Sequence, residues 1–154
     1  RDVERSRGLG DVYKRQIMDC GLSDVTLVSK KPNIISCDNI QISTGISDFN
    51  SAGLGNFNSS KYTFDVGMGS AEIDMSGSLN NDASVKIEVS VCSLELRLPS
   101  NTNINLSINQ NMLSSVNVKD LVSTGEGRYE SRHFQRSWSS MHNAISVGIG
   151  SVDV

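Results

Sequence analysis

The residues best suited to chemistry are three carboxylates and an arginine at matching positions of two segments. Glu72 and Asp74 are two residues apart, and Glu95 and Arg97 are spaced in the same way one segment later. If these segments are neighbouring strands paired in register, Glu72 lies beside Glu95 and Asp74 beside Arg97. Such a group could bind a cation or share a proton, although it is more often a solvated surface with weak ion pairs.

The strongest enzymatic alternative is a parallel β-helix that cleaves polysaccharides, which needs carboxylates and a basic residue converging on one face. The equivalent positions of other segments carry Thr26, Asn50, Asn117 and Asp153, which add no focused cluster. His133 and His142 are isolated and lack ligand spacing. We therefore expect no enzymatic activity, no catalytic residue, no cofactor and no metal site, and we keep the four charged residues as a candidate binding face.

A second candidate surface lies in a polar insertion over residues 119–141. Arginines alternate there with aromatic residues, and these residue types most often anchor interfaces. The candidate residues are Arg128, Tyr129, Arg132, Phe134, Arg136 and Trp138. They predict a surface for a protein partner or a membrane. The simpler alternative is a loop whose aromatic side chains cover the last repeat.

The segments that carry these residues belong to a repeat. Each of six copies has an apolar residue, a very small residue, an Asp or Ser, and two alternating apolar positions. The copies begin at Leu22, Ile46, Met68, Val91, Leu113 and Ile149, which are 24, 22, 23, 22 and 36 residues apart. Self-similarity at this period is typical of stacked β architectures, in which no unit buries its apolar face alone.

Apolar spacing predicts how each copy is built. Before the small residue, apolar side chains recur at every second position, which is the period of a half-buried strand. On this pattern Leu22, Ile46, Met68, Val91 and Ile149 should all point into the core. Alternation resumes three positions later, so a bend at the small residue must return both arms to one core. Because this position holds Gly in only two of six copies, we expect a restriction on size rather than a positive φ.

The stretches between copies are turn-like and too short for a crossover helix. We therefore predict an all-β, single-domain β-solenoid with rungs of about 22 residues; the alternative is a β-sandwich. Apolar runs stay below the roughly 18 residues needed to span a bilayer. Net charge is −3, which argues against a nucleic-acid partner. Cys20, Cys37 and Cys92 form no C-x-x-C pair and leave the redox state open.

Residues 1–16 stand apart from the repeat. Ser6 to Gln16, SRGLGDVYKRQ, matches the translation of the transposon end and read primer used in sequencing libraries. We interpret residues 1–16 as a translated adapter, excluded from fold reasoning as a tag would be. The natural chain then starts at Ile17, and residues 17–154 form one β-rack domain that we expect to be truncated at both ends.

Several motifs together resemble the toast-rack β-repeat domains, which are similar to the C-terminal domain of LiaF-type proteins of the cell-wall-active antibiotics response. The motifs are Gly53-Leu54-Gly55-Asn56, Phe64-Asp65-Val66-Gly67-Met68-Gly69-Ser70, Ile73-Asp74-Met75-Ser76-Gly77, Ala83-Ser84-Val85-Lys86-Ile87-Glu88-Val89, Leu96-Arg97-Leu98-Pro99 and Val147-Gly148-Ile149-Gly150-Ser151-Val152-Asp153-Val154. The resemblance implies a bacterial, membrane-associated or envelope-facing module without catalytic residues. We predict a non-enzymatic binding or scaffold module in cell-envelope stress; the alternative is a structural, adhesin-like surface solenoid.

Overall fold

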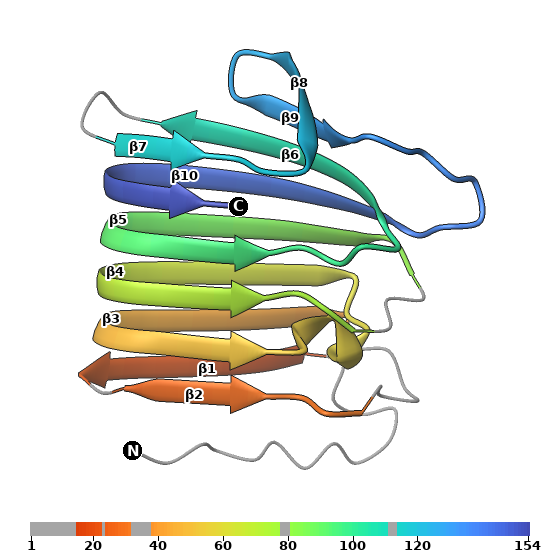
Figure 1. The fold of residues 1–154 in the computed structure, drawn as a ribbon. Coiled ribbons are helices and arrows are strands. Elements are labelled where there is room, and N and C mark those ends of the chain that lie inside the picture. Colours follow the sequence, from red (N-terminus) through yellow and green to blue (C-terminus); the bar gives the residue numbers. More distant parts are fainter. Residues whose placement is uncertain (1–14, 23, 32–37, 78–80, 111–113) are drawn as a thin grey trace.

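The protein folds into stacked β-strands, seen in a computed structural model that describes residues 15–22, 24–31, 38–77, 81–110 and 114–154 (Figure 1). The fold is all-β, as the alternating apolar pattern predicts. The short 3-10 helix η2 (Leu54–Phe57) follows the third strand. The strands are β1 (Arg15–Leu22), β2 (Val25–Val28), β3 (Asn39–Ala52), β4 (Lys61–Asp74), β5 (Ala83–Arg97), β6 (Asn103–Gln110), β7 (Ser114–Asn117), β8 (Leu121–Gly125), β9 (Arg128–Ser131) and β10 (Ser140–Asp153).

Each long strand is a U-shaped rung with two arms joined by a bend (Figure 1). β3, β4, β5 and β10 pass through the bend without interruption. In the first rung the arms are the separate strands β1 and β2, and β6 and β7 form another divided rung. Neighbouring rungs pair in parallel and in register. Equivalent positions of the repeat therefore form straight columns across the stack.

The core lies between the two arms and consists of such columns. A column of the first arm contains Ile42, Phe64, Ile87, Ile145 and Ile108. A column of the second arm contains Phe49, Ala71, Leu94, Val152 and Val116. All of these side chains are buried except Val116, which is partly buried against the core. Burial of these apolar columns between the two arms supplies the main driving force for folding.

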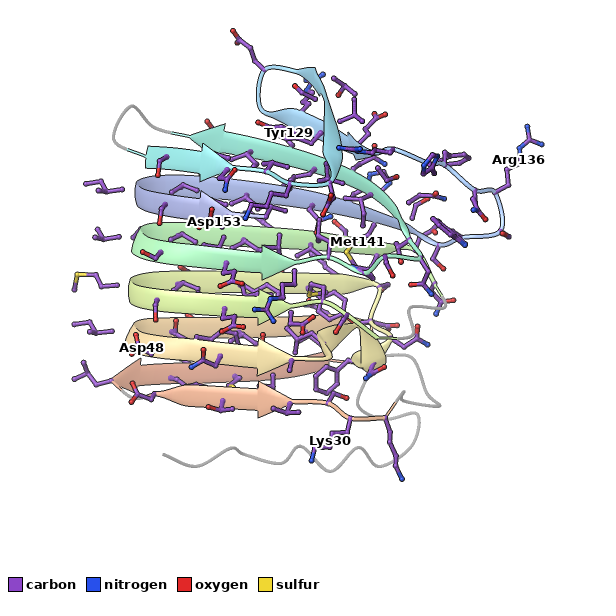
Figure 2. All side chains as sticks on the ribbon, in the orientation of Figure 1. Lys30, Asp48, Tyr129, Arg136, Met141 and Asp153 are labelled. Atoms are coloured by element: carbon purple, nitrogen blue, oxygen red, sulfur yellow. The ribbon has the colours of Figure 1, made fainter. Side chains whose placement is uncertain are left out.

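The bend departs from the predicted pattern. The sequence pattern predicted that Leu22, Ile46, Met68, Val91 and Ile149 point inward, and this is wrong: their exposed fractions are 78%, 51%, 47%, 47% and 46%. Alternation before the bend suggests an inward position, but the chain reverses direction there and the side chain at the apex points away from both arms. Figure 2 shows a column of side chains projecting outward from the bends.

Glycines allow the rungs to pack closely at the bend. A Cβ atom at Gly45 would lie 2.7 Å from the carbonyl oxygen of Gly21, and one at Gly148 would lie 2.5 Å from that of Ser90. The expected size restriction thus acts strongly one residue before the exposed apolar position. At the small-residue position itself, φ is +130° at Gly69 and +145° at Gly150. The prediction that this position needs no positive φ is therefore wrong for these two rungs.

The last rung along the chain is not the last rung of the stack. The strand order is β1-β3-β4-β5-β10-β6-β9-β8, so β10 lies between β5 and β6 (Figure 1). The predicted polar insertion over 119–141 contains the β8–β9 hairpin, which pairs antiparallel with β6. Ser140 and Met141, at the end of this range, belong to β10, and Met141 is fully buried. The insertion carries the chain back over β6 so that β10 gains a partner on each side.

Two predictions fall partly on segments that are not described. Of the proposed adapter, residues 1–14 lie outside the described residues, whereas the backbone of Arg15 and Gln16 extends β1 beside Asn39 and Ile40. The spacing of apolar residues also predicts a bulge or widened corner from Asn109 to Met112; residues 111 and 112 lie outside the described residues, whereas Asn109 and Gln110 belong to β6. Cys20 is a free, partly buried cysteine, whereas Cys37 and the side chain of Cys92 are outside what the structure describes.

Candidate binding cleft

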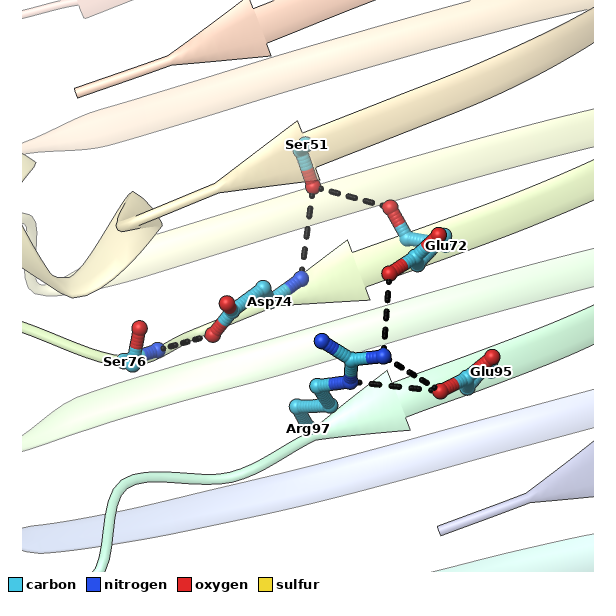
Figure 3. Close-up of polar contacts among 6 residues, drawn as sticks. All are labelled: Ser51, Glu72, Asp74, Ser76, Glu95 and Arg97. Carbon is cyan, nitrogen blue, oxygen red and sulfur yellow. Dashed lines mark hydrogen bonds and ion pairs between the residues drawn. The ribbon is translucent and has the colours of Figure 1, made fainter.

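The four charged residues of the candidate face lie at the ends of β4 and β5, and Arg97 contacts two of them (Figure 3). Strands β4 and β5 pair so that Glu72 is opposite Glu95 and Asp74 is opposite Arg97, which confirms the predicted register. The guanidinium contacts both glutamates, with Nη2 3.0 Å from Glu95 Oε1 and 3.2 Å from Glu72 Oε1. A second hydrogen bond joins Arg97 Nε to Glu95 Oε1 at 3.2 Å. One cation therefore bridges carboxylates on two rungs.

The arginine does not pair with the aspartate beside it. Asp74 Oδ1 instead accepts a hydrogen bond from the backbone N–H of Ser76 at 2.8 Å, where the chain leaves β4 (Figure 3). The backbone N–H of Asp74 donates to Ser51 Oγ at 3.4 Å, and this hydroxyl donates to the carbonyl of Glu72 at 3.1 Å. The ends of the β3 and β4 arms are thus tied together beneath the charged face.

The electrostatics of this face suit recognition better than proton transfer. The hydrogen bond with Glu95, followed by the charges of Glu95 and Glu72, raises the pKa of Arg97 above its ordinary value. The side chains of Arg97, Glu72 and Glu95 are 57%, 40% and 50% exposed. A permanently charged arginine with exposed carboxylates can bind a polar ligand, whereas general acid catalysis uses a carboxyl group whose pKa is raised by burial.

The six predicted residues of the insertion do not form one surface. Arg132 and Trp138 line one cleft, whereas Arg128 and Tyr129 line a second, smaller one. Phe134 is 72% exposed and lines neither of them. Arg136 projects from the outer end of the loop, away from the rungs (Figure 2). Tyr129 packs partly against the core, as the simpler alternative of a covering aromatic side chain predicts.

The first cleft brings the two predicted surfaces together. It has a volume of about 630 Å³, which is within the usual range for ligand sites. Glu95 and Arg97 line it from the end of β5, and Arg132 and Trp138 line it from the insertion. Glu72 and Asp74 do not line it, although Glu72 contacts Arg97. We call this site the terminal cleft, because it lies where the second arms end, far from the bend.

Asn103 positions the tryptophan side of the terminal cleft. Asn103 is 2% exposed at the start of β6. Its Nδ2 donates to the carbonyl oxygens of Gln135 and Trp138 at 2.8 and 3.2 Å, and its Oδ1 accepts from the N–H of Gln135 at 2.9 Å. A turn hydrogen bond from the N–H of Trp138 to Gln135 O, at 3.1 Å, completes the arrangement. One buried amide therefore holds both ends of the turn.

Four further charged or titratable residues of the terminal cleft escaped prediction as site residues: Lys119, Asp120, His133 and Asp153. The sequence pattern identifies Asp153 only as the equivalent of Glu95 in another rung. Because β10 pairs directly with β5, Asp153 is opposite Glu95 and joins the same column. Nothing in the local sequence indicates this neighbour. One feature of the sequence could have indicated it: the interval of 36 residues between Leu113 and Ile149, which is long enough for the chain to change its stacking order.

The second cleft, of about 300 Å³, lies on the outer face of the first arm beside the hairpin. Arg128, Glu130 and His142 line it together with Tyr129. Within the part of the chain that the structure describes, no group of three or more His, Cys, Asp or Glu residues is arranged to hold a metal ion. In the same described residues, no helix is long and apolar enough to cross a bilayer.

Comparison with known proteins bears on the fold. No protein-family model matches the chain, and neither does any curated protein. Among solved structures, the chain is similar to a protein from Clostridium sporogenes described as a "putative cell adhesion protein". The TM-score is 0.65 at 15% sequence identity, and the match covers 92% of each chain. The protein therefore shares an all-β fold with this clostridial protein.

Proposed function

We propose that this protein is a non-enzymatic, adhesion-type binding module of the bacterial cell envelope, and that the terminal cleft holds its ligand. The observation that carries the proposal is the convergence of Glu95 and Arg97 with Arg132 and Trp138 in that cleft. An aromatic residue with neighbouring charged side chains offers both apolar contact and directional hydrogen bonds. The fold shared with the clostridial protein described as a cell adhesion protein supports an adhesin-like role.

We interpret the stack of two-armed rungs as a β-solenoid of the toast-rack type. In the LiaF-like version of this proposal, the module is a scaffold of an envelope-stress complex and its partner is a protein or a membrane surface. Glu95, Asp120 and Asp153 line the terminal cleft together with Arg97, Lys119 and Arg132. This mixture of charges favours a polar ligand over nucleic acid, because a polyanion would be repelled by the three carboxylates.

The proposal is tested by binding of the whole chain to an array of purified surface glycans and extracellular-matrix proteins. The double variant Arg132→Ala, Trp138→Ala should lose binding while its β circular-dichroism spectrum and melting temperature stay close to wild type. Phe134→Ala is the matched control, because it removes an aromatic side chain from the same loop without altering the terminal cleft. Binding by the double variant as tight as that of wild type would contradict the assignment of the cleft.

The enzymatic alternative needs its own assay. The chain is incubated with the polysaccharides of the array, and new reducing ends are measured. We expect none above the level of the Glu72→Gln, Glu95→Gln variant. Release of reducing ends by the wild-type chain, and its loss in this variant, would favour a polysaccharide-cleaving enzyme instead.

A further inference from the structure

A continuous apolar ridge runs along the bends of five rungs, far from the terminal cleft. Leu22 is opposite Ile46, Ile46 opposite Met68, Met68 opposite Val91, and Val91 opposite Ile149. Each side chain is between 46% and 78% exposed. Single exposed apolar residues are ordinary, whereas a contiguous apolar surface indicates an interaction site. We call these five residues the bend ladder.

The surroundings of the bend ladder make it protrude. The residues immediately before it include Gly45, Gly67 and Gly148, and the residues immediately after it include Gly69 and Gly150. These positions have no side chain to cover the ridge. With about 4.8 Å between rungs, five rungs give a ridge about 19 Å long. An α-helix of about 13 residues has the same length.

Charge beside the bend ladder indicates what can cover it. Three residues before the ladder, the first arm carries exposed Asp19, Asp65 and Glu88, and two residues after it the second arm carries exposed Asp24 and Asp48. The remaining equivalents at these positions, Ser43, Ser146, Ser70, Ser93 and Ser151, are uncharged. Among the side chains that the structure describes, Glu88 is the only one of these five acids that forms an ion pair: its Oε1 lies 2.9 Å from Lys86 Nζ.

The occupant of the bend ladder could be a second copy of the chain, a bilayer or a polypeptide segment. The acidic residues beside the ladder argue against the first two. A second copy packed ladder to ladder would set carboxylates against carboxylates, and like charges brought together oppose association. An anionic bilayer would meet the same repulsion. A segment with an apolar stripe between two basic rows would complement both the ridge and its acidic borders.

We propose that the bend ladder docks an amphipathic polypeptide segment whose apolar stripe is flanked by Lys or Arg. This interaction is separate from the terminal cleft and does not rest on the function proposed for it. The ridge supplies the apolar contact, and the carboxylates on both sides set the orientation of the bound segment. The predicted partner is a basic amphipathic helix of about 13 residues.

The probe for this proposal is a fluorescein-labelled synthetic helix of about 14 residues, with Leu on one face and Lys on the remainder. Fluorescence anisotropy should show binding to the whole chain that weakens as salt is raised. The variant Met68→Ser, Val91→Ser should bind about tenfold more weakly, or worse, because apolar contact is lost. Val122→Ser is the matched control, since Val122 is as exposed as Met68, at 47%, but lies on β8.

Charge is tested separately with Asp65→Asn, Glu88→Gln, which should also weaken binding and reduce its salt dependence. A peptide of the same composition without an apolar face, and a Leu/Glu helix with the same apolar face, should both bind poorly. Circular dichroism and thermal melting of each variant establish that the fold is retained.

Three results would overturn the proposal. The first is undetectable binding of the Leu/Lys helix, or equal binding by the scrambled peptide or by the Met68→Ser, Val91→Ser variant. The second is a dimer in sedimentation that this variant abolishes, which would make a second copy the occupant. The third is flotation of the wild-type chain with anionic phospholipid vesicles that the same variant loses, which would make the ridge a lipid contact. Each result is independent of binding in the terminal cleft, which Arg132→Ala, Trp138→Ala probes.

Discussion

The side-chain amide of Asn103 donates a hydrogen bond to the carbonyl of Trp138, with 3.2 Å between Nδ2 and O. These residues are 35 positions apart in the sequence, and the β8–β9 hairpin lies between them. The bond anchors the turn that carries Trp138 to the buried start of β6. The wall of the terminal cleft is therefore held by the rung stack rather than by the loop alone.

Replacing Asn103 by Ala should destabilise the protein by about 1–3 kcal/mol, because buried groups of the turn lose their partners. The emission of Trp138, the chain's single tryptophan, should shift to longer wavelength as the turn loosens. Urea denaturation and intrinsic fluorescence measure the two effects. Ser107→Ala, at an exposed position of the same strand, should change neither, and wild-type emission from Asn103→Ala would refute the positioning role.

Because the rungs approach closely at the bend, replacing two glycines of the same column by Ala should have opposite effects on stability. Gly148→Ala should cost about 1–3 kcal/mol, because the added Cβ meets the carbonyl oxygen of Ser90 at 2.5 Å. Gly21→Ala should be neutral or slightly stabilising, since no atom lies within 4 Å of the added Cβ. Urea denaturation compares the two variants, and equal losses of stability would show that rung spacing is not the constraint.

Tyr62 is fully buried, and its hydroxyl connects the loop after β3 to the core. The hydroxyl donates to the carbonyl of Leu54 at 3.0 Å and accepts from the N–H of Ser59 at 3.1 Å. Tyr62→Phe should cost about 1–3 kcal/mol, because two buried backbone groups lose a partner. Amide exchange at Ser59 should accelerate together with the fall in stability. Unchanged exchange would mean that another group satisfies this N–H.

The ion pairs of Arg97 should make the effect of its replacement on the melting temperature depend on salt concentration. Arg97→Gln leaves Glu72 and Glu95 as neighbouring carboxylates without their cation, so the melting temperature should fall at low ionic strength. Near 0.15 M salt the difference should nearly vanish, because a Debye length of about 8 Å screens exposed charges. Lys31→Gln makes the same change in net charge at an exposed position and should show little of this effect. A loss for Arg97→Gln that is independent of salt would indicate packing instead.

The proposed adapter predicts that residues 1–14 are dispensable. Deleting them while keeping Arg15 and Gln16, whose backbone pairs with β3, should leave the melting temperature within a few degrees. Differential scanning calorimetry of the shortened chain tests this directly. A large fall would show that the excluded segment contributes to the fold.

Local spacing was sufficient for several features of this protein. Alternating apolar residues specify strands because side chains of a strand point to opposite faces, and the constant repeat length aligns equivalent positions of neighbouring rungs. This is why the sequence alone predicts that Glu72 is opposite Glu95, as it is in the structure. The same rule placed Met68 in the core and was wrong there, because alternation holds only while a strand continues in one direction.

Only the tertiary structure decided which rungs are neighbours. Rungs with similar apolar patterns present nearly equivalent edges, so the sequence by itself does not state that β10 enters between β5 and β6. That choice depends on contacts across long separations, such as the hydrogen bond of Ser140 with Asp82, 58 residues away. It also sets Asp153 beside Glu95 and brings Trp138 to the cleft that Arg97 lines. The sequence determined the rungs and their columns, whereas the terminal cleft arose from the order in which non-local pairing stacked them.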